Sequence, residues 1–230
     1  MDIFGALFGK GKTRPAAKFH FVDNMVVSAR DYGFYSANQF AYGPATELFE
    51  AVFKSPEHGP MLPIAPVAAR LPAVPHLYFM AFHTAIYAVY ARELLRADDA
   101  TMAEIAAGAE KALGDIRTPE GEPLAEATRR SLQSACAKFA AAIVDDMNEM
   151  LAETPERPRQ FPSRATKLLL ALVEQSFHQG APRPELLLAG IGAEHAARLQ
   201  LLDEAPAKVL HFLGSDRKVR VVGERLVPGT

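Results

Sequence analysis

The chain has 230 residues, of which 49% are hydrophobic and 23% are charged, and its formal net charge is −2. This length allows a substantial core in one or two domains. A charge so close to zero excludes a strong global attraction to nucleic acid or anionic lipid. Cys136 is the one cysteine, which excludes an internal disulfide and is typical of a reducing compartment. The many alanines, arginines and prolines indicate a bacterial protein, for which we expect a cytoplasmic location.

Residues 1–15 are predicted to form a flexible tail, because glycines weaken any helix in so short a segment. Their apolar residues precede their basic residues, the reverse of the order in a secretory signal peptide. The alternative is that residues 3–14 contact a membrane surface or the groove of a partner, with Phe4, Leu7 and Phe8 on the apolar side.

Helical spacing of apolar residues begins at Lys18 and predicts a helix that Gly33 interrupts. The apolar face of this helix comprises Phe19, Val22, Met25, Val26 and Ala29. A second helix is predicted from Gly43 to Phe53, with Pro44 in its first turn. Six prolines between residues 55 and 75 exclude a long helix there and predict an ordered connector.

The segment His76–Arg96 is apolar nearly all round, which indicates either a central buried helix or a membrane span. Residues 73–91 carry no charge and are long enough to cross a bilayer. Two histidines, a threonine and three tyrosines within them argue against a span. We therefore predict an all-α fold, a multi-helix bundle around the central helix 76–96, and consider an integral membrane protein unlikely.

The remaining pattern predicts a helix from the capping box Thr101–Glu104 to near Gly114 and a long helix over residues 122–153. The polar, proline-rich residues 154–162 form a predicted linker. Ser163 is expected to cap the next helix, and a short helix is expected to begin at Pro206. Residues 218–222 alternate like a strand, with residues 225–227 as their expected hairpin partner. The predicted organisation is thus a tail (1–15), a helical domain (16–153), a linker (154–162) and a helical subdomain with a terminal β-ribbon (163–230).

Residues 186–199 hold a short apolar stretch, the turn Gly190-Ile191-Gly192 and the start of another helix. This segment resembles a helix-hairpin-helix motif, in which backbone amides at the second helix grip phosphate. The resemblance implies nucleic-acid contact through these residues: Gly190, Ile191, Gly192, Arg198, Lys218 and Arg220. Ala193 and Glu194 occupy the positions where such motifs usually carry lysine or arginine. The alternative is a tight corner between two helices.

His76 and His83 lie seven residues apart and therefore share one face of the central helix. With Tyr87 and Tyr90 they could line a pocket for a small molecule or haem. The spacing is too long for both to bind one ion directly. The alternative is a core helix whose imidazoles bond to neighbouring protein groups.

An acidic cluster crowds the end of the long helix, where negative charge is unfavourable: Asp145, Asp146, Glu149 and Glu153. It predicts either a compensating cation or a solvated end near Arg157 and Arg159.

The sequence contains no nucleophile elbow, phosphate-binding loop or dinucleotide-binding fingerprint. We therefore predict no catalytic residue, no metal site and no cofactor. The leading hypothesis is a non-catalytic helical interaction or adaptor protein. An unpartnered strand edge and the apolar tail favour self-association or a protein partner. Nucleic-acid contact at Gly190–Gly192 and a ligand pocket at His76 and His83 are the alternatives.

Overall fold

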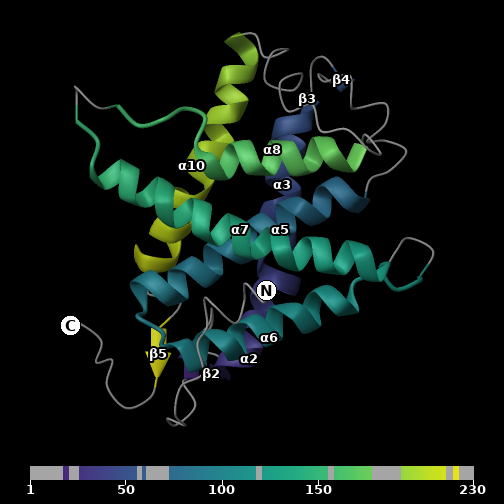
Figure 1. Ribbon diagram of the computed structural model, residues 1–230, viewed down its shortest axis with the longest axis vertical. Coiled ribbons are helices and arrows are strands. Elements are labelled where there is room, and N and C mark those ends of the chain that lie inside the picture. The colour runs from purple at the N-terminus through teal and green to yellow at the C-terminus, as the bar shows by residue number, and fades with distance from the viewer. Residues whose placement is uncertain are drawn as a thin grey trace.

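A computed structural model describes residues 18–20, 26–55, 59–60, 73–117, 121–154, 158–177, 193–215 and 220–222. Over these residues the fold is all-α, as predicted (Figure 1). The helices are α2 (Ala29–Tyr35), α3 (Tyr42–Phe53), α5 (Ala73–Val89), α6 (Asp99–Asp115), α7 (Glu126–Leu151), α8 (Arg164–Phe177) and α10 (Ala193–Ser215), with π-helical turns η2 (Ser36–Phe40) and η3 (Tyr90–Leu94). The short strands are β1 (Lys18–His20), β2 (Val26–Ser28), β3 (Lys54–Ser55), β4 (Gly59–Pro60) and β5 (Arg220–Val222).

Helix α5 is the centre of the bundle, as its uniformly apolar sequence predicts, and η3 extends it to Leu94. Phe79, Phe82 and Ile86 are fully buried on it. Helix α7 crosses α5 on one side, and α3 and α8 also pack against α5. Among the described residues, no helix has the length and hydropathy needed to cross a membrane.

Helices α8 and α10 belong to the same apolar cluster as α5 and α7. Leu169 and Val173 of α8 and Leu202 of α10 have no exposed surface and pack in that cluster. The Tyr90 hydroxyl also donates a hydrogen bond to the Leu213 carbonyl of α10, at 3.1 Å. The division of the chain at residues 154–162 remains a prediction.

The predicted helix from Lys18 is wrong, because β1 and β2 form there and pair antiparallel. Strand β1 also pairs antiparallel with β5, Lys18 opposite Val222. The predicted terminal ribbon is therefore part of a three-stranded sheet of order β2-β1-β5, and the expected partner 225–227 lies outside the described residues. Gly33 does not interrupt a helix but lies within α2.

Two helix starts also differ from the prediction. Asp98, not Thr101, caps α6, because its Oδ1 atom accepts a hydrogen bond from the Thr101 amide at 2.9 Å. Pro206 lies inside the continuous helix α10 and does not begin a separate one. Burial of Leu202, Ala205 and Leu210 on both sides of Pro206 offsets the backbone hydrogen bond that proline cannot donate.

Candidate functional site

The two histidines of α5 lie within hydrogen-bonding distance of neighbouring protein groups. This agrees with the alternative that they are core residues of the helix and not ligands of a bound molecule. The Nε2 atom of His76 lies 2.7 Å from the Thr46 hydroxyl. His83 is buried, and its Nδ1 atom lies 3.0 Å from the Phe79 carbonyl one turn earlier on the helix. Burial lowers the pKa of His83 to about 4, so its imidazole is neutral at pH 7.

Tyr87 and Tyr90, the tyrosines of the predicted pocket, take part in hydrogen bonds with different parts of the chain. The Tyr32 hydroxyl donates to the Tyr87 carbonyl at 3.0 Å, whereas Tyr90 bonds to α10. Burial raises the pKa of Tyr87 to about 12 and also raises the pKa of Tyr90. Of the predicted set His76, His83, Tyr87 and Tyr90, Tyr87 lines the groove described next.

The predicted nucleic-acid contacts Gly190, Ile191, Gly192 and Lys218 lie outside the described residues, as do residues 3–14. Arg198 is in α10 and Arg220 is in β5.

A groove of about 870 Å³, which no sequence pattern singled out, lies among the described residues. It runs between α6 and α7, with α5 as its floor and the α2–η2 segment at its side. Its lining comprises Tyr32, Gly33 and Ser36; Thr84, Ala85, Tyr87, Ala88, Val89, Arg92 and Glu93; Met102, Ala103, Ile105, Ala106, Ala107, Ala109, Glu110 and Leu113; and Gln133, Cys136, Ala137, Ala140, Ala141, Val144 and Asp145. Alanine is the commonest residue in this set. Its short side chain leaves open space between the facing sides of α6 and α7.

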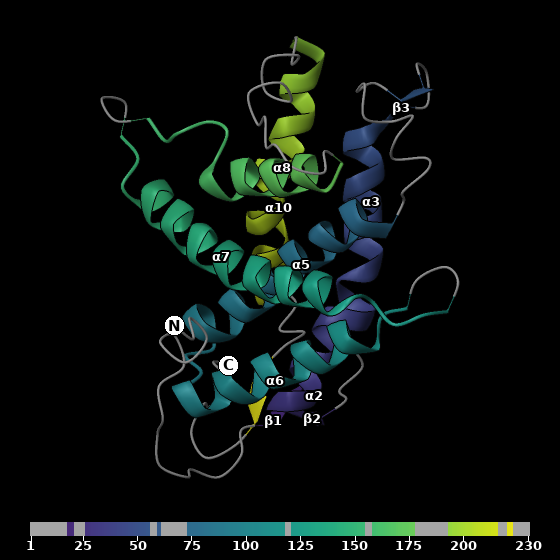
Figure 2. The same cartoon turned by 45° about the vertical axis from the view of Figure 1, so that its right-hand side comes forward.

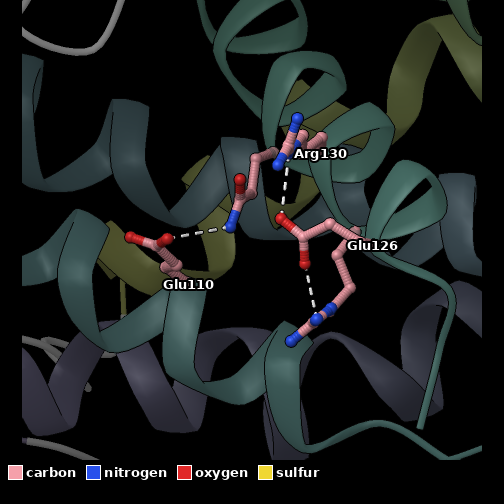
Figure 3. Close-up of polar contacts among 5 residues, drawn as sticks. Glu110, Glu126 and Arg130 are labelled. Carbon is pink, nitrogen blue, oxygen red and sulfur yellow. Dashed lines mark hydrogen bonds and ion pairs between the residues drawn. The ribbon is translucent and has the colours of Figure 1, made fainter.

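The groove is narrow at one end and wide at the other. Figure 2 shows the end of α6 close to the start of α7, and the two helices spreading apart toward the end of α7. Near the narrow end the two helices are bridged by Gln133, whose Nε2 atom donates to Glu110 Oε1 at 3.0 Å (Figure 3). Because the chain runs in opposite directions along α6 and α7, Glu93 and Asp145 lie toward the wide end.

Ser36 is the unusual polar residue of the groove. Its side chain is 1% exposed, and its Oγ atom meets no hydrogen-bond partner in the part of the chain that the structure describes. Burial holds the pKa of Tyr32 well above its ordinary value, and the nearby Ser36 hydroxyl offsets only part of this rise.

Cys136 lies on the α7 wall of the groove beside Ala137 and Ala140. Its thiol donates to the Ala81 carbonyl at 3.4 Å, and burial raises its pKa to about 12. The thiol is therefore protonated at neutral pH and is a weak nucleophile.

The acidic cluster at the end of α7 receives its compensating charge from α8. Asp146 accepts hydrogen bonds from the backbone amides of Arg164 and Ala165, at 3.0 and 2.9 Å. The Arg164 guanidinium pairs with Asp145, at 3.2 Å, and with Glu149. Arg164 is thus the cation paired with this cluster, Arg159 lies near it, and residue 157 lies outside the described part. No group of three or more metal-ligating side chains gathers among the described residues.

Sequence reasoning missed both Ser36 and the alanine walls. The available signal was the helical spacing of Ala137, Ala140 and Ala141, which also fits an ordinary packed face. No protein-family model, curated protein or solved structure significantly matches the chain.

Proposed function

We propose that this protein is a non-catalytic helical binding protein that holds an elongated apolar small molecule in the groove between α6 and α7. The observation that carries the proposal is the groove itself, whose facing α6 and α7 walls are mainly alanine. A volume of about 870 Å³ is within the range of small-molecule sites, which are mostly apolar with a few placed polar groups.

The titratable groups of the groove favour binding over catalysis. Acid–base catalysis works best with a pKa close to the operating pH, whereas Tyr87 and Cys136 have pKa values of about 12. Both side chains therefore remain neutral at pH 7. Neither side chain is therefore suited to exchanging protons with a ligand.

The groove is lined by Thr84, the residue after His83, and by Tyr87, one turn further along α5. His83 does not line the groove, and its ring bonds to its own helix, which disfavours a role as an axial haem ligand. A protein partner, self-association, a cytoplasmic location and nucleic-acid contact remain predictions from the sequence.

The proposal is tested by titrating the full chain with Nile red, a neutral apolar dye whose emission increases away from water. Ala141 is exposed on the groove wall, so Ala141→Trp fills the groove without entering the core. We expect saturable binding that Ala141→Trp weakens by at least about tenfold, equivalent to about 1.4 kcal/mol.

Ala127→Trp is the matched control, because Ala127 is also exposed on α7 but does not line the groove. It should bind the dye like the unaltered chain. The proposal is overturned if the dye does not bind saturably, or if both variants bind it equally well.

A further inference from the structure

The charged side chains around the groove differ in whether protein partners neutralise them. Arg92 donates to Asp99 Oδ1 at 2.6 Å and to the Ala97 carbonyl at 3.3 Å. Asp145 is paired with Arg164 at 3.2 Å. Glu93 is half-buried on η3 and forms no ion pair within the described residues. The wide end of the groove therefore presents an uncompensated negative charge.

The narrow end carries the Glu110 carboxylate, beside the first turns of α7 where Arg129 and Arg130 share the single carboxylate of Glu126 (Figure 3). Glu110 accepts its hydrogen bond from the neutral amide of Gln133, so its charge is also unneutralised. Taken together, the lining has three carboxylates and one guanidinium. At the wide end Glu93 would repel a ligand carboxylate and attract an ammonium group.

We infer that the ligand of this groove is a lipophilic amine, a molecule with an unbranched apolar body and a positively charged group placed beside Glu93. This inference rests on the proposed function, because it specifies which apolar molecules the groove selects. The alanine walls accommodate the body, and the half-buried carboxylate of Glu93 contacts the ammonium at the wide end. Water screens a half-buried pair incompletely, so the charge adds selectivity to the apolar contact.

The test compares three ligands of equal chain length, decylammonium, 1-decanol and decanoate, each below its micelle-forming concentration and at low salt. Displacement of Nile red from the full chain measures each affinity. We expect decylammonium to bind about three- to tenfold more tightly than 1-decanol and decanoate to bind most weakly.

Glu93→Gln removes the negative charge at the wide end of the groove but keeps the size of the side chain. It should lower decylammonium affinity to that of 1-decanol and leave 1-decanol unchanged. Glu104→Gln is the control, since Glu104 is exposed on α6 and does not line the groove.

The outcomes distinguish the two proposals. If none of the three ligands displaces the dye and the dye itself does not bind, the proposed function fails. If 1-decanol binds but decylammonium binds no better, or if Glu93→Gln changes neither affinity, the inference of an amine is overturned while the groove remains a binding site.

Discussion

Gly33 of α2 and Gly108 of α6 are in reciprocal contact with each other's helix. A Cβ atom added to Gly33 would lie 1.9 Å from the Ile105 carbonyl oxygen, and one added to Gly108 would lie 1.9 Å from that of Arg30. Each contacted carbonyl lies three residues before the opposite glycine. The two backbones therefore touch in a way that no larger residue permits, and this contact fixes α6 as one wall of the groove.

Either glycine should be intolerant of a methyl group. We expect Gly33→Ala or Gly108→Ala to lower the free energy of unfolding by about 1–3 kcal/mol, because backbone atoms must move apart. Gly114→Ala in the same helix α6 meets nothing within 4 Å and should be neutral or stabilising, since alanine favours helix. Urea denaturation measures all three, and equal stability of the Gly108 and Gly114 variants would contradict the close crossing.

Phe82 lies in the core and has no exposed surface. Its ring packs edge-to-face against that of Phe139, with 5.4 Å between the ring centroids. Truncation by Phe82→Ala should cost about 3–5 kcal/mol. Leu151→Ala is the comparison, because Leu151 is 81% exposed and should change stability by less than about 0.5 kcal/mol. A denaturant midpoint unchanged in Phe82→Ala would place α5 outside the core.

Stability should depend on His83 at mildly acidic pH. The folded-state pKa of about 4 is below the ordinary value of 6.5, so the unfolded chain binds the proton more tightly. The contribution of His83 is therefore complete above about pH 6.5 and is lost as the pH falls toward 4, amounting to roughly 3 kcal/mol.

The check is the pH dependence of unfolding free energy between pH 4 and 7 in the unaltered chain and in His83→Gln. The substituted chain should show a correspondingly shallower dependence. Identical slopes would mean that His83 titrates normally and is not buried.

The start of α8 should depend on carboxylates from two other helices. Asp203 of α10 is buried and accepts the Ser163 amide at 2.9 Å, while Asp146 of α7 accepts the next two amides. Asp203→Ala leaves the Ser163 amide without its acceptor and should cost about 1–3 kcal/mol. Glu153→Ala, at an exposed position near the end of α7, should be nearly silent. Thermal unfolding compares the two, and equal melting temperatures would argue against this capping.

The sequence predicts the central helix well because one property, apolar character on all sides, decides its position. Sequence-based prediction fails at Lys18–Ser28, where the spacing of Phe19 and Val26 fits a helix. The segment instead forms strands, because β1 pairs with β2 and with β5, some 200 residues later in the chain. Such distant pairing leaves no local signal. Pro206 is misread for a similar reason, since tertiary burial around it outweighs its local preference.

The candidate site is harder to predict than the fold. Ser36 and the alanines of α6 and α7 are ordinary helix residues, and they form a groove only because of the angle between two helices that meet near one end. The histidines were more conspicuous in the sequence, but imidazole rings are also common in cores where protein groups satisfy them. For the acidic cluster the sequence left open a compensating cation or a solvated end, and the compensating Arg164 and α8 amides come from beyond the predicted linker.

The most direct test of the central claim is a spectrum of the full chain labelled with ¹³C on its alanine methyl groups, recorded during titration with 1-decanol. The account predicts saturable shifts of Ala106 and Ala140, which line the groove, and none of Ala127 and Ala207, which are exposed elsewhere. Saturable shifts confined to alanines outside the groove, or no saturable shift at any alanine, would contradict it.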